Sequence, residues 1–267
     1  MISNERLQTL AREAGVTAGL AEKNYVNSWI LHAVYESELR TALVFKGGTA
    51  LSKLYFPELW RFSEDLDFTA TGEILPIESR LDATLVETGR ESGITFDITN
   101  IHRAGDESVE FVRIDVQYDA VLGQQNTTQL EITCNESLAF PATHHRHRFE
   151  DTPEFTIRAY SIDEILVEKL RSLYQRARAR DYYDIYHLLD QEEFDTRDIG
   201  QALQRKARQQ DVELDLRGGL PDQDTAAVRD YWDQALDRLV TEKPPFDAVS
   251  RRIDSYLDEL HQHTESQ

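Results

Sequence analysis

Two aspartates spaced two residues apart, within the stretch from Phe45 to Thr69, are the side chains of this sequence best suited to chemistry on phosphates. If they lie in a strand, side chains alternate and Ser63, Asp65 and Asp67 share one face. Carboxylates held that close repel each other unless a cation lies between them, and such oxygen ligands suit Mg²⁺ better than zinc. The spacing therefore predicts a site for a divalent cation.

A glycine turn precedes these acids. Residues 43–45 are expected to form a short buried strand, and after Lys46 the pair Gly47 and Gly48 lets the backbone turn sharply with its N–H groups exposed. Thr49 is expected to cap the helix that follows, and such a helix N-terminus attracts anions. A tight turn or an exposed strand edge would explain either feature alone. Their occurrence in one strand, turn, helix and strand unit favours a phosphate site.

A third carboxylate is expected opposite the two aspartates, as a phosphoryl-transfer site with two cations normally requires. Two segments with strand alternation, 109–118 and 129–134, supply the candidates. Glu131 is the first choice and Asp115 the second. A solvated sheet face in an acidic protein would also explain both.

A basic segment follows in the second half of the chain, where five cations stand close together: Lys169, Arg171, Arg176, Arg178 and Arg180. Such a cluster suits a nucleotide tail or an RNA end. Asp181 and Asp184 lie three residues apart on the next expected helix. An Arg-rich loop that pairs with local acids is the alternative.

The overall charge is strongly negative, with 49 acidic and 29 basic residues and a net charge of −20. A negative surface normally argues against nucleic-acid binding. However, 23 of the basic residues are Arg and six are Lys, which resembles a protein from a high-salt cytoplasm, where salt screens such repulsion. We therefore interpret the acidity as an adaptation to solvent.

A soluble cytoplasmic protein without a membrane partner is expected. The single cysteine, Cys134, has no intrachain partner, residues 1–15 lack an apolar signal region, and no run approaches the length of a membrane span.

Periodicity predicts an α+β fold, with a mixed sheet and helices on one side of it, followed by a helical domain. We expect residues 1–140 to form the core with its N-terminal helices, and residues 141–267 to form a helical domain that completes the active-site cleft. The run of histidines at 144–147 has no ordered metal-ligand spacing, so 140–153 is interpreted as a polar linker. Expected helices are 4–15, 17–39, 76–91, one from Ser161, 196–209, 225–239 and 245–261.

Two of these motifs resemble a known family. Gly47-Gly48-Thr49 followed by the string Arg61 to Asp67 is similar to the signature of AbiEii-type nucleotidyltransferases, the toxins of type IV toxin–antitoxin and abortive-infection systems, which include the MenT toxins. Lys169 and Asp184 match the downstream motif of that family.

The resemblance implies a minimal nucleotidyltransferase fold and transfer of NMP from an NTP to an RNA acceptor such as the tRNA 3′ end, by a toxin that a cognate antitoxin restrains. It implies that Asp65 and Asp67, with Glu131, hold Mg²⁺ or Mn²⁺, and that the turn at 46–49 and Arg180 bind the nucleotide. Lys169 would neutralise transition-state charge, Asp184 would orient Lys169 or help to activate the acceptor hydroxyl, and Ser63 would contact phosphate or carry a modification. A kinase-like phosphotransferase acting on a protein such as the antitoxin, and a non-catalytic binding module, are the rival hypotheses.

Overall fold

The computed structural model describes residues 1–57, 63–74, 76–105, 110–134, 136–220, 222–237, 239–240 and 242–264. The chain divides into two compact units, Met1–Glu136 with Ala142–Tyr160, and Ser137–Pro141 with Ser161–Gln267. This division differs from the expected cut after residue 140, because residues 142–160 add two strands to the sheet of the first unit.

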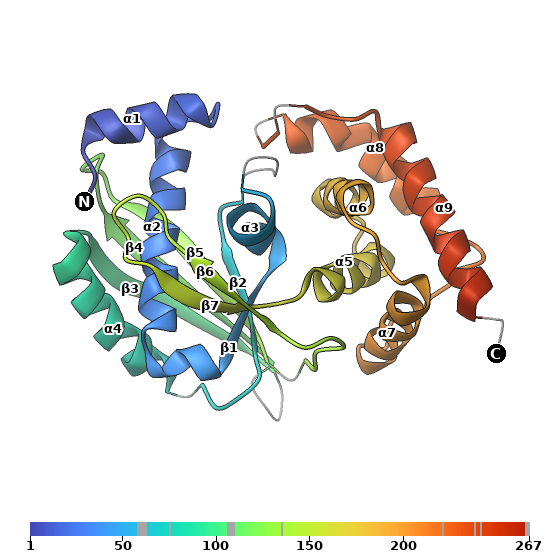
Figure 1. Ribbon diagram of the computed structural model, residues 1–267, viewed down its shortest axis with the longest axis horizontal. Coiled ribbons are helices and arrows are strands. Elements are labelled where there is room, and N and C mark those ends of the chain that lie inside the picture. The colour runs from blue at the N-terminus through green and yellow to red at the C-terminus, as the bar shows by residue number, and fades with distance from the viewer. Residues whose placement is uncertain are drawn as a thin grey trace. The chain divides into compact units, whose positions relative to one another are not determined.

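Within the described residues, the first unit contains a seven-stranded mixed sheet in the order β3-β4-β5-β2-β1-β7-β6 (Figure 1). Its strands are β1 (Leu43–Lys46), β2 (Leu66–Ala70), β3 (Thr95–Ala104), β4 (Phe111–Asp119), β5 (Asn126–Thr133), β6 (Thr143–His147) and β7 (Phe155–Ala159). β1 pairs with β7 in parallel and β2 with β5 in parallel, and the other neighbours are antiparallel. The mixed sheet of the sequence prediction is confirmed.

Alternation of side chains explains the long strands β4 and β5. Val112, Ile114 and Val116 of β4 are buried, as are Leu130 and Ile132 of β5, while the residues between them are partly exposed. Apolar residues at every second position bury one sheet face. Asp106 and Val109, at the expected turn and strand start before β4, lie outside the described residues.

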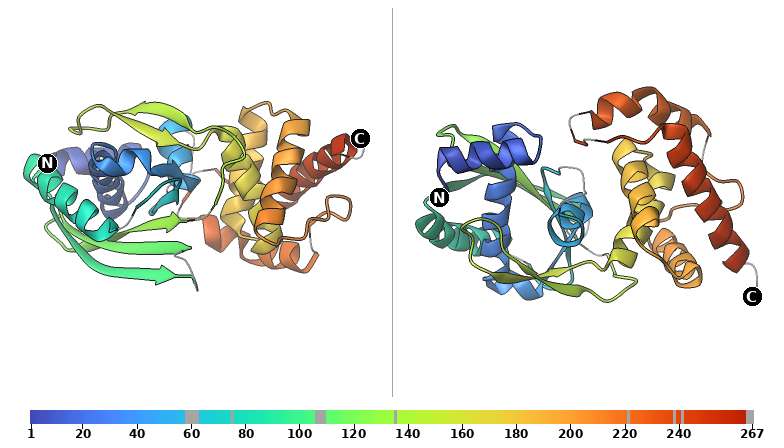
Figure 2. Two further views of the ribbon diagram at one scale, coloured as in Figure 1. Left: turned by 90° about the horizontal axis from the view of Figure 1, so that it is seen from below. Right: turned by 45° about the horizontal axis from the view of Figure 1, so that its top comes forward.

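Helices α2 (Ala18–Tyr35) and α4 (Ile77–Ser92) pack against each other and against the sheet, α4 on β3 and α2 on β7. In the left view of Figure 2, α2 lies between the β6–β7 hairpin and strands β3 to β5. Hydrogen bonds from α2 reach both sides, since Ser28 bonds to His147 of β6 and Asn27 bonds to Thr128 of β5. α2 is thus a buried central helix. Val86 of α4 is exposed, whereas Ile77, Leu81 and Leu85 of the same helix are buried.

Hydroxyl side chains cap the first two helices. Thr17 accepts a hydrogen bond from the Leu20 N–H and caps α2. Ser3 caps α1 (Asn4–Glu13). α2 ends at Tyr35, and the separate 3₁₀ turn η1 (Glu38–Thr41) occupies the rest of the segment expected to be helical.

The segment expected to be a linker is partly a strand. β6 forms the sheet edge, with His145 and His147 on one side and His144 and Arg146 exposed on the other. Pairing with β7 and packing against α2 override the polar composition, so the linker interpretation is wrong.

The second unit is helical in its described part, with α5 (Ile162–Gln175), α6 (Ala179–Gln191), α7 (Thr196–Gln209), α8 (Asp222–Leu236) and α9 (Phe246–Thr264). Ser161 accepts a hydrogen bond from the Glu164 N–H at the start of α5, as predicted. The Glu164 carboxylate accepts hydrogen bonds from the N–H groups of Ala139 and Phe140, each at 2.8 Å, and from Lys206.

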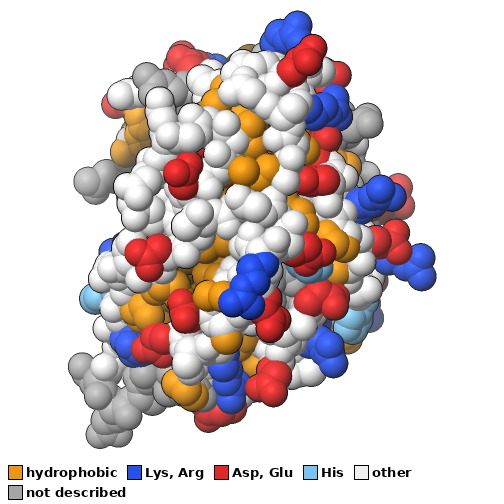
Figure 3. All heavy atoms as spheres, turned by 90° about the vertical axis from the view of Figure 1, so that its left-hand side faces the viewer, with side chains coloured by type: hydrophobic (Ala, Val, Ile, Leu, Met, Phe, Trp, Pro, Cys, Tyr) orange, Lys and Arg blue, Asp and Glu red, His pale blue; other side chains and the backbone are white. Residues whose placement is uncertain are grey.

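The charged surface is visible in Figure 3, where acidic side chains are spread over that face of the molecule among fewer basic ones. This distribution agrees with the net charge of −20. Among the described residues, no helix combines the length and the apolar character needed to cross a membrane.

Candidate functional site

Strand register in the first unit aligns three charged residues on adjacent strands. Lys46 of β1 is opposite Asp67 of β2, and Asp67 is opposite Glu131 of β5. Directly paired residues project from the same sheet face, and neighbouring strands are about 4.8 Å apart. Leu66 and Phe68, on either side of Asp67 in the chain, are fully buried on the opposite face. The fold therefore brings the carboxylates of Asp67 and Glu131 to adjacent positions, although they are 64 residues apart in sequence.

The two candidates for a third carboxylate differ in their surroundings. Asp115 is opposite Gln129, two register pairs from Glu131, and it accepts hydrogen bonds of 3.0 Å from Asn100 Nδ2 and from Gln129 Nε2. These bonds use both carboxylate oxygens. Glu131 occupies the position directly beside Asp67, so we retain it as the candidate ligand.

Ser63 and Asp65 lie in a different place from the one expected. β2 begins at Leu66, and Ser63 and Asp65 belong to the segment that leads into it. The strand alternation that was expected to align Ser63, Asp65 and Asp67 therefore holds only from Leu66 onward. Thr49 Oγ1 donates a hydrogen bond to the backbone carbonyl of Asp65 at 2.6 Å. Arg61 and Phe62 of the motif lie outside the described residues.

The glycine turn abuts the acid pair. Gly47 has a φ of +78°, a conformation that favours glycine, and a Cβ at this position would overlap the Asp67 carboxylate. The turn opens the short helix α3 (Gly47–Ala50), which continues as the π-helical segment η2 (Leu51–Tyr55). Thr49 does not cap it, because its hydroxyl bonds to Asp65. Sequence reasoning thus found the turn but assigned Thr49 the wrong partner.

Lys46, expected to contact a nucleotide, is buried beside polar groups of its own unit. Its Nζ lies 3.3 Å from Glu136 Oε2, 3.3 Å from Thr133 Oγ1 and 5.6 Å from the ring centre of Tyr160. The ion pair with Glu136 was missed by sequence reasoning, because no spacing rule links residues on separate elements.

Lys53 of η2 is a half-buried lysine near the turn. It donates to the Asn24 carbonyl at 2.9 Å and to Ser28 Oγ at 2.8 Å, and its ammonium lies 5.1 Å from the ring centre of Phe149. Burial disfavours the charged form and lowers the pKa of Lys53 to about 7. Burial, together with the charge of Lys53, lowers the pKa of His147 to about 3.

The donor set of the first unit fits Mg²⁺ or Mn²⁺ with two carboxylates. Within the part of the chain that the structure describes, no three side chains of His, Cys, Asp or Glu gather closely enough to hold a metal by themselves. Mg²⁺ is commonly held by one or two carboxylates plus phosphate oxygens of a substrate. Asp67 and Glu131 are paired across adjacent strands, and Asp65 precedes Asp67 by two residues. Their carboxylate oxygens are the type of ligand that such an ion requires.

In the second unit, Lys169 of α5 lies between two aspartates of α6. Its Nζ is 2.6 Å from Asp184 Oδ2 and 3.1 Å from Asp181 Oδ1. All three side chains are buried, with Asp184 at 0% exposure. The structure brings Asp184, expected beside Lys169, into contact with its ammonium, and Asp181 is a second partner that the sequence did not indicate.

The basic cluster expected around Lys169 divides by burial. Lys169 and Arg171 are buried within the unit, whereas Arg176, Arg178 and Arg180 are exposed. A second buried ion pair lies nearby, with Lys206 Nζ 2.5 Å from Glu164 Oε1. Sequence reasoning did not find this pair, since its members lie on α5 and α7.

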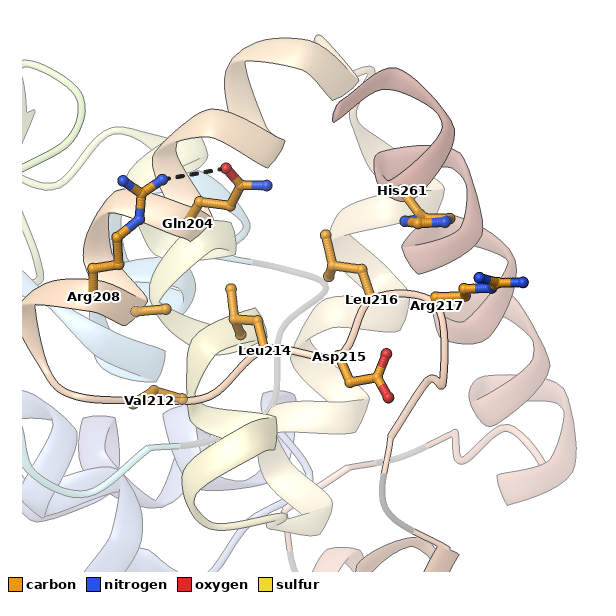
Figure 4. A pocket seen from close by; sticks show the side chains of 9 residues that line it. Gln204, Arg208, Val212, Leu214, Asp215, Leu216, Arg217 and His261 are labelled. Atoms are coloured by element: carbon orange, nitrogen blue, oxygen red, sulfur yellow. Dashed lines mark hydrogen bonds between the residues drawn. The ribbon is translucent and has the colours of Figure 1, made fainter. Parts of the chain in front are cut away.

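One cavity of about 420 Å³ lies in the second unit between α7, the segment after it and α9 (Figure 4). Leu214 and Leu216 lie near its centre, with Arg208, Arg217 and His261 around them. None of the site residues expected from the sequence lines it, so the cavity is separate from the chemistry described above.

Comparison with known proteins gives the family. The model of the family "Nucleotidyl transferase AbiEii toxin, Type IV TA system" matches residues 29–259. In fold, the chain is similar to MenT4, a nucleotidyltransferase toxin from Mycobacterium tuberculosis H37Rv, with a TM-score of 0.68, 19% identity, and coverage of 96% of this chain and 92% of that one. An antigenic nucleotidyltransferase-like protein from Paracoccidioides brasiliensis also matches, at a TM-score of 0.39 and 14% identity over 71% of this chain and 89% of that one.

No curated protein matches the sequence. The family match covers most of the chain, and it includes both motifs on which the resemblance was based. The chain therefore belongs to the AbiEii family of nucleotidyltransferase toxins.

Proposed function

We propose that the protein transfers NMP from an NTP to an RNA acceptor in a reaction that requires Mg²⁺ or Mn²⁺, with the tRNA 3′ end as the first acceptor to test. The observation that carries the proposal is the register pairing of Asp67 with Glu131 beside the Gly47 turn. An acid pair next to a glycine turn suits a metal-bound polyphosphate. The family supports nucleotidyl transfer.

The residues of the first unit would bind the nucleotide. Asp65, Asp67 and Glu131 would hold the cation, which when bound neutralises charge on the phosphates and aligns them for displacement. The backbone of Gly47, Gly48 and Thr49 would bind phosphate oxygens, with Lys46 supplying positive charge at the same end of β1. Ser63 would contact a phosphate or carry a modification.

The residues of the second unit would supply positive charge to the same reaction. Lys169 would neutralise charge that develops on the phosphates, and Asp184 would fix the direction of its ammonium through their 2.6 Å contact. The exposed Arg180 would bind the nucleotide or the RNA end by its guanidinium. Phosphoryl transfer depends mainly on positioning and charge stabilisation, so no covalent nucleophile is required.

The biological setting follows from the family. A toxin of a toxin–antitoxin system has a cognate antitoxin, which we propose as the protein partner. The proposed substrates, NTP and RNA, are both present in the cytoplasm, so we propose that the protein acts there.

The reaction class is tested by incubating the protein with total RNA and Mg²⁺ and either α-³²P or γ-³²P NTP. We expect label from the α position on RNA, and loss of that label in Asp65→Ala. Because the composition resembles that of proteins from high salt, the assay includes a molar-salt arm.

Two other outcomes would contradict the proposal. Label from the γ position on a protein, such as the antitoxin, would indicate a phosphotransferase. Absence of transfer by the wild-type protein, at both low and high salt and with each of the four NTPs, would indicate a binding module.

A further inference from the structure

The backbone just before β2 is held by side chains from three elements of the first unit. Asn27 of α2 donates from Nδ2 to the Glu64 carbonyl at 2.9 Å, and Thr128 of β5 reaches the same oxygen at 3.3 Å. Thr49 of α3 donates to the next carbonyl, that of Asp65, at 2.6 Å. These bonds fix two successive peptide groups ahead of Leu66, the first residue of β2 in the ladder.

The three side chains are fully buried, and two of them bond to each other. Thr128 Oγ1 lies 2.8 Å from Asn27 Oδ1, so its hydrogen is shared between that oxygen and the Glu64 carbonyl. Asn27, Thr49 and Thr128 each have 0% exposure. Buried polar groups whose hydrogen bonds are satisfied form rigid networks. One turn earlier on α2, Lys23 pairs with the Glu64 side chain at 3.2 Å.

We propose that Asn27, Thr128 and Thr49 are positioning residues that set where the Asp65 carboxylate lies, relative to Asp67 in the strand, when both hold the metal. The inference rests on the proposed function, because it concerns the same acids. Asp65 precedes the strand, so ladder hydrogen bonds do not fix its place, and the three buried side chains hold the peptide groups on both sides of it. A displacement of about 1 Å in a reacting group costs about 10²-fold in rate.

The test removes one hydroxyl at nearly constant side-chain volume. In Thr128→Val we expect kcat for nucleotidyl transfer to fall about 10- to 100-fold, with KM for the NTP changed less than about twofold. Thr128→Ser, which keeps the hydroxyl, is expected to restore most of kcat. Thr127→Val is the matched control, because Thr127 is the neighbouring residue of β5 and projects from the opposite face.

A second measurement does not depend on transfer. Mn²⁺ binding to the protein alone, followed by the electron paramagnetic resonance of the free ion, is expected to weaken about tenfold in Thr128→Val and to stay unchanged in Thr127→Val. This readout also separates the two proposals. If the wild-type protein transfers no nucleotide but Mn²⁺ binding responds in this way, the positioning role stands and the proposed reaction fails.

Folded Thr128→Val with wild-type kcat and wild-type Mn²⁺ affinity would overturn the inference. A kcat that falls only in proportion to the folded fraction, determined by circular dichroism, would also overturn it, since that result indicates a structural role alone. If Thr128→Val does not fold, kcat and Mn²⁺ affinity are measured instead for Thr49→Val and Thr49→Ser and judged by the same criteria. Thr49 bonds to the carbonyl of Asp65, the one after that of Glu64.

Discussion

The functional charges of the two units are arranged in opposite ways. In the first unit, Asp67 and Glu131 are like charges on adjacent strand positions, and both are only partly buried. In the second unit, Lys169 is matched by two aspartates within 3.1 Å, all buried. Like charges placed together repel each other and favour the binding of a cation, whereas a buried lysine with its own carboxylates is already stabilised. We propose that the first arrangement binds a divalent ion and that the second holds an ammonium in one orientation.

The largest effect is expected from removing the cation of the second unit. Lys169→Met leaves Asp184 and Asp181 buried without their ammonium, and such a loss costs about 3–5 kcal/mol of unfolding free energy. Urea denaturation measures it. The matched control is Lys243→Met, since Lys243 also contacts two aspartates, at 2.7 and 2.6 Å, but on the surface. We expect almost no change there.

A double variant separates stability from activity in this prediction. Lys169→Met combined with Asp184→Leu replaces the ion pair by apolar side chains and is expected to recover part of the stability while nucleotidyl transfer stays lost. Transfer at the wild-type rate in a folded Lys169 variant would show that the ammonium serves structure only.

The choice of Glu131 as the partner of Asp67 is tested by neutralising Glu131 and, separately, Asp115. Glu131→Gln is expected to lower kcat about 10²- to 10³-fold, the range typical of losing one electrostatic contact to a transition state. Asp115→Asn is expected to change kcat little. Asp115 lies on the neighbouring strand, and its carboxylate oxygens already accept hydrogen bonds from Asn100 and Gln129. The reverse order of effects would make Asp115 the third carboxylate.

A smaller effect is expected from a substitution in the glycine turn, which lies close to the acid pair. Gly47→Ala places a Cβ against the Asp67 carboxylate at a φ of +78°. The left-handed conformation alone costs about 1–2 kcal/mol for a residue with a Cβ. Gly123→Ala is the control, since Gly123 has a φ of +63° and no atom near its Cβ position. We expect both variants to lose thermal stability, Gly47→Ala more than Gly123→Ala because of the contact with Asp67, and transfer to be lost only in Gly47→Ala.

Some elements could be predicted from the sequence and others could not. α7 has the predicted ends, Thr196–Gln209, because a strong apolar period and Asp195 as a cap define it locally. β4 and β5 were predicted by alternation. β6 was missed, since its partner β7 and the helix behind it, not its own composition, make it a strand.

The site shows the same limit. The spacing of Asp65 and Asp67 identified the acids, but the pairing of Asp67 with Glu131 is a property of strand order, which no local pattern encodes. Lys169 and Asp184 were found through their family motif. Glu136 beside Lys46, and Asn27 behind Glu64, were missed because each contact joins elements far apart in the chain.

The smallest effect concerns Lys53, whose pKa is lowered to about 7 by burial. Between about pH 7 and its ordinary value of 10.5, the unfolded chain binds a proton at Lys53 that the folded chain does not. Lys53 therefore makes the unfolding free energy increase as the pH rises through this window. Lys53→Met is expected to flatten the dependence of the urea midpoint on pH between 7 and 10. An unchanged slope would show that Lys53 is charged when folded.

The most direct test of the acid pair as the metal site is the rate at which label from α-³²P NTP reaches RNA, measured for the wild type and for Asp67→Asn with and without Mg²⁺. The wild type is predicted to label RNA only when Mg²⁺ is present, and Asp67→Asn, which keeps its shape but loses its charge, is predicted to label none under either condition. Labelling by the wild type in excess EDTA, or by Asp67→Asn at the wild-type rate, would contradict the account.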